Sequence, residues 1–110
     1  MRHLLFDEIS SSDMERLEKH LQQHAEAGPI DRIYFVEFPH DLLTGDQRIH
    51  ENCRPYCFAL ETGKSWIKIE LLVRSRNTLH CSCIQYANRE QTDFILRFSE
   101  RLIRECNLRT

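Results

Sequence analysis

The stretch from Pro55 to Ala87 constrains the fold more than any other part of this chain, because it predicts three consecutive antiparallel strands. Apolar and polar residues alternate along much of it, which is the period of a strand with one buried face. Thr62–Gly63 and Arg76–Asn77 are residue pairs that favour two-residue hairpin turns, and they divide the stretch into strands of similar length. The segment therefore predicts an antiparallel meander.

The two turns also set a register, in which Phe58 lies opposite Ile67 and Val73 lies opposite His80. Because successive side chains of a strand point to opposite faces, this register divides the residues into two sets. The face with more apolar surface is the predicted core face, and it contains Tyr56, Phe58, Leu60, Ile67, Ile69, Leu71, Val73, Ile84 and Tyr86. The opposite face contains Cys57, Ala59, Trp66, Lys68, Glu70, Leu72, Leu79, Cys81, Cys83 and Gln85.

Two helices and a fourth strand flank the meander. Ser10 or Ser12 caps the start of a helix that Gly28–Pro29 ends. The β-branched and aromatic residues of Ile30–Phe38 predict a strand. Apolar residues at helical spacing predict a second helix, which runs from Asn88 to about Cys106. The element order is therefore α-β-β-β-β-α.

We expect these elements to form one domain over residues 1–110, with an α+β two-layer sandwich fold. A four-stranded antiparallel meander with the N- and C-terminal helices on one face is the simplest arrangement that buries both apolar helix stripes. The strand Ile30–Phe38 joins either edge of this meander, because the long loop Pro39–Asn52 after it permits both.

Composition excludes several classes of protein. The hydrophobic fraction of 41% suits a single core, and no apolar run is long enough to span a membrane. The net charge of −2, with basic and acidic residues well mixed, argues against a nucleic-acid partner. The segment Met1–Glu8 lacks the apolar run of a signal peptide. We therefore expect a cytoplasmic protein whose five cysteines are mostly reduced.

Four of those cysteines form the candidate metal or redox group: Cys53, Cys57, Cys81 and Cys83. His50 and His80 lie nearby in the sequence, and zinc favours four such ligands in a tetrahedron. In the predicted register a third strand separates Cys57 from Cys81 by about 9–10 Å, so the thiols meet only if the loop with Cys53 folds over the sheet. The alternative is that the cysteines are small core residues and that the protein has no cofactor.

A surface for a protein partner is the other main expectation. The second sheet face carries Trp66, Leu72 and Leu79, and the apolar arc of the C-terminal helix extends to Leu96 and Ile103. This is more apolar surface than one interface between sheet and helices uses. The alternative is that the loop Pro39–Asn52 packs over Trp66 and completes a small second core.

The sequence thus favours a small interaction domain that binds a protein partner or forms a homodimer. A metal-binding or redox-responsive thiol module is the alternative. An enzyme that uses His40, Asp46 and His50 of the long loop is a third interpretation, although no nucleophile stands beside them. His20 and His24, one helical turn apart, are interpreted as boundary residues of the first helix.

Overall fold

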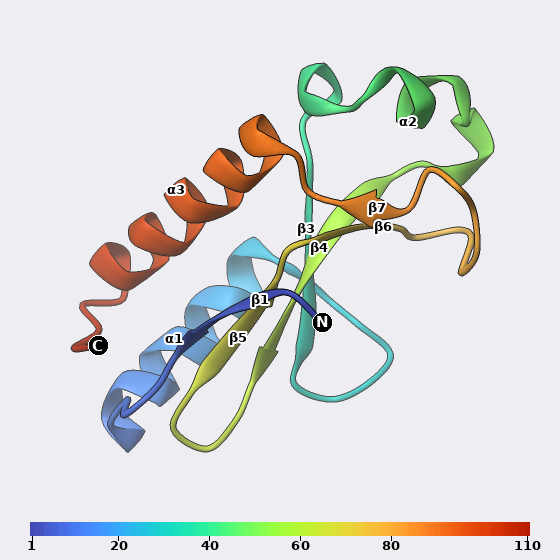
Figure 1. Ribbon diagram of the computed structural model, residues 1–110. Coiled ribbons are helices and arrows are strands. Elements are labelled where there is room, and N and C mark those ends of the chain that lie inside the picture. The colour runs from blue at the N-terminus through green and yellow to red at the C-terminus, as the bar shows by residue number, and fades with distance from the viewer.

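The computed structural model describes residues 1–110 and has the predicted α+β two-layer architecture. Helices α1 (Ser11–His24) and α3 (Arg89–Glu105) pack on one face of an antiparallel sheet, and a short helix α2 (Gly45–Ile49) lies in the long loop. In Figure 1, α1 lies behind the sheet, and α2 lies beside the connection between β6 and β7. The predicted fold class is confirmed.

The sheet has seven strands rather than four. The strands are β1 (His3–Phe6), β2 (Glu26–Ala27), β3 (Ile33–Glu37), β4 (Tyr56–Thr62), β5 (Ile67–Glu70), β6 (Leu72–Ser75) and β7 (Gln85–Tyr86). Two of the extra strands are the short β1 and β2, and the third arises because the middle strand of the meander divides into β5 and β6. The order is β1-β5-β4-β3-β2, with β6 paired to the start of β4 and β7 paired to β6. The strand predicted at Ile30–Phe38 therefore joins the β4 side of the meander.

The first hairpin has the predicted faces but a different register. Ile67 lies opposite Thr62 of β4, four residues beyond the predicted partner Phe58. The turn spans four residues instead of two, and it is closed by a 2.8 Å hydrogen bond from the N–H of Gly63 to the carbonyl oxygen of Trp66. Because the shift is even, each side chain keeps its face. Phe58 and Ile67 are accordingly both buried, as predicted.

The second hairpin differs more, because Arg76–Asn77 does not form a two-residue turn. Val73 lies opposite Gln85, five residues beyond the predicted partner His80. Residues 76–84 instead form a long irregular connection between β6 and β7. An odd shift exchanges the two faces of the last strand. The predicted register of this strand was therefore wrong, and with it the facing of Cys83 and Tyr86, whereas Ile84 packs against the core as predicted.

The change of facing moves a cysteine into the core. Cys83, predicted on the face opposite the core, is fully buried in the hydrophobic core, whereas Tyr86, predicted in the core, is 39% exposed. The hydroxyl of Ser75 ends β6, because it donates to the carbonyl oxygen of Cys53 and accepts hydrogen bonds from the N–H groups of Asn77 and Thr78. These bonds replace the ladder that a tight hairpin would have continued.

The main core lies between the sheet and the two long helices. Phe58 of β4 contacts the ring of Phe98 of α3 edge-on, with ring centroids 5.4 Å apart. Leu17 and Leu21 of α1 are fully buried in the same cluster. Each such side chain stabilises the fold by roughly 1.5–3 kcal/mol through burial. The core therefore holds both helices against β4 from the same side.

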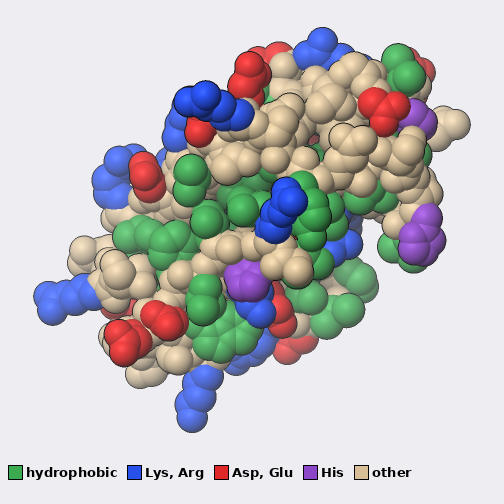
Figure 2. All heavy atoms as spheres, in the orientation of Figure 1, with side chains coloured by type: hydrophobic (Ala, Val, Ile, Leu, Met, Phe, Trp, Pro, Cys, Tyr) green, Lys and Arg blue, Asp and Glu red, His purple; other side chains and the backbone are tan.

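The other face of the sheet has no helix over it. Figure 2 shows hydrophobic side chains there that are interrupted by Lys, Arg and His side chains. Arg76 lies over the ring of Phe35 at 4.1 Å from its centroid and forms a 3.2 Å ion pair with Glu26. Lys68 lies over the ring of Trp66 in the same way, at 5.3 Å. Long cationic side chains thus cover much of the apolar surface of this face.

The start of α1 is tied to the C-terminal end of the chain through one buried carboxylate. Ser10 is the N-cap, and its hydroxyl accepts a hydrogen bond from the N–H of Asp13. The carboxylate of Asp13 pairs with Arg16 and accepts a 3.2 Å hydrogen bond from the N–H of Arg109. The hydrogen bonds from Arg109 and Arg16 hold the pKa of Asp13 below its usual value, although burial acts in the opposite direction.

Asp13→Asn should lower the free energy of unfolding at pH 7. Because folding lowers the pKa of this carboxyl, its contribution is present above about pH 4 and is lost as the pH falls through the lowered value. The difference between wild type and variant in urea unfolding should therefore shrink below about pH 4. Asp93→Asn, at an exposed position of α3, is the matched control and should show little effect. A difference that is as large at low pH as at neutral pH would contradict this account of Asp13.

Candidate metal centre

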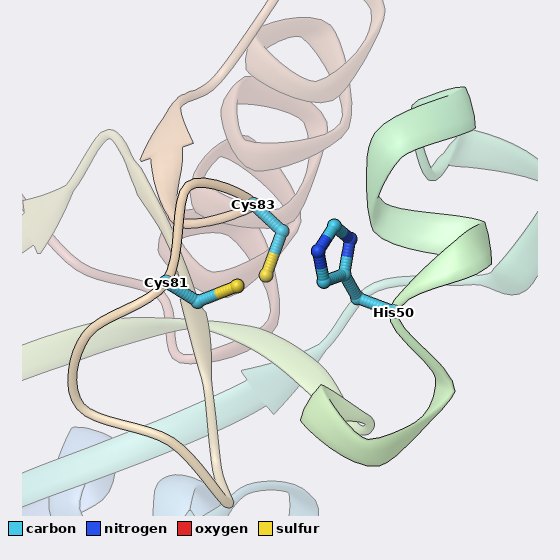
Figure 3. Close-up of side chains that lie close together, drawn as sticks. All are labelled: His50, Cys81 and Cys83. Carbon is cyan, nitrogen blue, oxygen red and sulfur yellow. The ribbon is translucent and has the colours of Figure 1, made fainter.

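The two irregular connections of the fold bring a histidine and two cysteines together. His50 follows α2, whereas Cys81 and Cys83 lie between β6 and β7. The imidazole nitrogen and the two sulfur atoms that could bind a metal all lie within 4.8 Å of one another. Figure 3 shows the sulfur atoms pointing toward each other and toward the His50 ring. This is the single group of three or more potential ligands with such spacing in the chain.

Cys53 completes a set of four. Its residue is buried at the end of the 3₁₀ helix η2 (Glu51–Cys53), one turn after His50. Its thiol donates a weak 3.7 Å hydrogen bond to the hydroxyl of Thr78 and interacts with the thiols of Cys81 and Cys83, but its sulfur does not belong to the group of atoms that lie within 4.8 Å of one another. Three thiols and one imidazole therefore converge from two segments of the chain. We refer to these four residues as the Cys3His cluster.

The predicted ligand set is thus brought together in part. Cys53, Cys81 and Cys83 meet because the loop with Cys53 folds over the end of the sheet, which was the condition that the sequence imposed. Cys57 does not join them, because it points from β4 to the open face, where burial raises the pKa of its thiol to about 12. Of the two histidines, His50 joins the cluster and His80 is exposed.

The orientation of His50 is fixed by the last turn before it. Its Nδ1 atom lies 2.6 Å from the carbonyl oxygen of Asp46, which can only accept, so Nδ1 carries the hydrogen. This hydrogen bond is the main reason that the pKa of His50 is raised. In the neutral ring the free lone pair then lies on Nε2. Histidines that bind metals have this arrangement, in which the other ring nitrogen donates to a backbone carbonyl.

A tight turn places the two cysteines of the β6–β7 connection. The N–H of Ile84 donates to the carbonyl oxygen of Cys81 at 3.1 Å, which closes a turn around Ser82 and Cys83. The backbone N–H and the thiol of Cys83, which lie beside the sulfur of Cys81, lower the pKa of that thiol. Burial raises the pKa of Cys83. The two neighbouring thiols therefore differ in their readiness to ionise.

Two buried glutamines hold the turn with Cys81 and Cys83 in place through hydrogen bonds. Gln47 of α2 donates a 3.2 Å hydrogen bond to the carbonyl oxygen of Cys83, and it accepts one of 3.0 Å from Gln91 of α3. Gln91 also donates to the carbonyl oxygen of Leu42 at 2.9 Å. Each glutamine belongs to a capping box at the start of its helix. Gln47 was not predicted, although Thr44 three residues before it is the signal of such a box.

Tyr56 closes the base of the cluster. Its hydroxyl donates to the carbonyl oxygen of His50 at 3.3 Å and lies beside the thiol of Cys83. Burial raises the pKa of this hydroxyl well above its usual value, so Tyr56 stays neutral and acts as a donor. The first residue of the central strand thus contacts both halves of the Cys3His cluster.

The predicted partner-binding residues lie on three parts of the molecule. Trp66, in the β4–β5 turn, and Leu72 of β6 are half-buried on the open sheet face. Leu79, in the β6–β7 connection, is 86% exposed. On α3, Leu96 is 38% exposed, whereas Ile103 packs against the core. The loop Pro39–Asn52 packs toward α3 through Gln47 and leaves Trp66 uncovered by that loop.

The two histidines of α1 contact each other, and one of them contacts α3. His20 of α1 lies 3.4 Å from the carboxylate of Glu105 of α3 and stacks on His24, with ring centroids 4.3 Å apart. Burial is the main reason that the pKa of His20 is lowered. In the long loop, Asp46 contacts His50, and His40 is exposed. These positions agree with the interpretation of His20 as a boundary residue.

Comparison with protein-family models, curated proteins and solved structures finds no match for this chain. None of the helices combines the length and the apolar character that crossing a lipid bilayer requires. The functional interpretation therefore depends on the residues of the cluster and the contacts that hold them.

Gln47→Leu should destabilise the protein by about 1–3 kcal/mol, because the buried carbonyl oxygen of Cys83 loses its donor. The change keeps the side-chain volume similar, so the effect reports the hydrogen bonds. Gln23→Leu, at an exposed position of α1, is the matched control and should change stability by less than about 0.5 kcal/mol. Urea unfolding measures both. Equal effects of the two changes would show that the glutamine pair does not support the cluster.

Proposed function

We propose that this protein is a small zinc-binding α+β domain, in which His50, Cys53, Cys81 and Cys83 hold one metal ion. The observation that carries the proposal is the spacing of the ligand atoms of His50, Cys81 and Cys83, which lie within 4.8 Å of one another although they come from two distant segments. Cys53, buried three residues after His50, is the fourth ligand that we propose, because its thiol interacts with the thiols of Cys81 and Cys83.

The ligand types favour zinc. Three thiols and one imidazole are the donors of a closed structural zinc site, in which no position is left for a substrate. At bond lengths of about 2.0–2.3 Å, the corners of the tetrahedron are about 3.3–3.8 Å apart. The observed atoms would have to approach by about 1 Å to reach that spacing, which side-chain rotation can supply.

The proposed ion would join two segments that have little regular structure of their own. Residues 50–53 are linked to the end of β6, and to the connection that leads to residues 81–83, by a few hydrogen bonds, among them those from the hydroxyl of Ser75 to the carbonyl oxygen of Cys53 and from the thiol of Cys53 to the hydroxyl of Thr78. Four metal bonds would add a much stronger link between them. The role is therefore structural, in a reducing compartment such as the cytoplasm that keeps the thiols available.

Native mass spectrometry of protein purified without chelator tests the proposal. We expect one zinc ion per chain in the wild type. Cys53→Ala, Cys81→Ala, Cys83→Ala and His50→Ala should each weaken binding by more than the roughly 10- to 100-fold that loss of a hydrogen-bond partner of a ligand causes.

Cys57→Ala is the matched control, because this thiol is also buried but points to the other face of the sheet. It should bind zinc as the wild type does. Wild-type protein that takes up no zinc when the ion is added in excess would refute the proposal, as would an equal loss of zinc in Cys57→Ala.

Protein binding is a second candidate function. The observation that favours it is the exposure of large apolar side chains near the Cys3His cluster, with Leu79 exposed by 86% and Ile49 by 75%. Apolar side chains that extend this far into water are frequent at binding surfaces. This candidate is compatible with a structural zinc ion, which would hold both side chains in place.

The same mass spectra report the number of subunits and so test self-association. If two copies associate through this surface, the wild type should be a dimer at micromolar concentration, and Leu79→Ser should shift the population toward monomer. Ser82→Ala, at a neighbouring exposed position, is the control and should leave the dimer intact. A wild-type monomer over the whole concentration range would exclude self-association.

A further inference from the structure

We infer that Cys81 is a site of oxidation by peroxides, and that Cys83 converts the oxidised thiol into a Cys81–Cys83 disulfide. The first observation is the unequal accessibility of the three thiols in the cluster. Cys53 and Cys83 are buried, with exposed fractions of 6% and 0%, whereas Cys81 is partly exposed. A peroxide from solution therefore reaches Cys81 first.

The second observation is the position of the resolving thiol. The turn closed by Ile84 holds Cys81 and Cys83 on one side of the connection, with their sulfur atoms directed toward each other. The two sulfur atoms lie within 4.8 Å of each other. Because residues 76–84 form no strand, the two sulfur atoms can approach through side-chain rotation within the turn without breaking a sheet ladder.

The chemistry balances with peroxide as the named oxidant. The sulfur of Cys81 attacks one oxygen of hydrogen peroxide, the O–O bond breaks, and a sulfenic acid and water form. The sulfur of Cys83 then attacks the sulfur of Cys81, the S–O bond breaks, and the oxygen leaves as a second water. In total the two thiols lose two electrons and two protons, and one peroxide is reduced to two waters.

The consequence for a bound ion rests on the proposed function. A disulfide removes two of the four ligands and leaves His50 and Cys53, which bind zinc far more weakly than a complete set. Oxidation of Cys81 would then release the ion. The disulfide itself does not depend on zinc, so the two ideas can be tested separately.

The first experiment uses metal-free wild-type protein treated with hydrogen peroxide, alkylated and digested with trypsin. The tryptic peptide 77–89 contains Cys81 and Cys83 and no other cysteine. We expect this peptide to lose two hydrogen masses and to escape alkylation, while Cys53, Cys57 and Cys106 stay free. A cross-link between peptide 77–89 and the peptide with Cys53 would overturn the assignment of Cys83, and unchanged thiols would overturn the inference as a whole.

Variants distinguish the role of Cys81, as the thiol that peroxide oxidises, from that of Cys83, as the thiol that forms the disulfide. Cys81→Ser should slow the loss of thiols by roughly tenfold or more, because the remaining thiols are less accessible. Cys83→Ser should still form a sulfenic acid at Cys81, which dimedone traps, but no disulfide within the peptide. Cys57→Ser is the matched control and should behave as the wild type. Equal rates in Cys81→Ser and wild type would show that Cys81 is not the primary site.

The second experiment repeats the treatment on zinc-loaded protein with a chromophoric zinc chelator present. We expect one zinc ion to be released for each disulfide formed, and no faster release from Cys57→Ser than from the wild type. Disulfide formation without release would contradict the link to zinc. If no zinc binds at the outset, the proposed function fails, and the first experiment still decides the oxidation of Cys81.

Discussion

Strand β4 is the element on which the rest of the structure depends, because it pairs with three other strands and is buried on both faces. Along most of its length it pairs with β3, while its end pairs with β5 and its start pairs with β6. Its core face carries Phe58, which contacts α3, and its other face carries the buried Cys57 and Ala59. Its first residue, Tyr56, also supports the Cys3His cluster. Site and core therefore share one strand.

The geometry of the cluster is held by hydrogen bonds to the backbone more than by packing. Gln47 fixes the carbonyl oxygen of Cys83, Asp46 fixes the ring of His50, and Tyr56 contacts both parts of the cluster. Burying two glutamine amides is costly unless their polar atoms find partners. Here the partners of Gln47 and Gln91 come from different helices and from the β6–β7 connection, so the burial also positions the turn with the two thiols.

The sequence predicted the fold class and the core of the first hairpin, but not the second hairpin. The reason is that the strand pairing shifted by an even number of residues in the first hairpin and by an odd number in the second. A turn of four residues at Gly63 shifted the pairing by an even number and left every side chain on its predicted face. The connection after Ser75 shifted it by an odd number and put Cys83 in the core. The alternation of apolar residues shows which side chains of a strand share a face. It does not show the length of the loop between strands, which is set here by side-chain hydrogen bonds such as that from the hydroxyl of Ser75 to the carbonyl oxygen of Cys53.

The size of the hydrophobic core limits what a metal ion could do in this protein. Small zinc domains whose ligands meet only when the ion is present are unfolded without it. Here 20 buried residues form one hydrophobic cluster, and although Cys53 and Cys83 belong to it, most of its members are side chains of the sheet and the two long helices. The residues that orient the ligands, such as Gln47 and Tyr56, belong to this fold and need no ion to be placed. If the proposed ion binds, its loss would therefore loosen the two connections while the sheet and helices stay folded, and a reversible change confined to one edge of the molecule becomes physically possible.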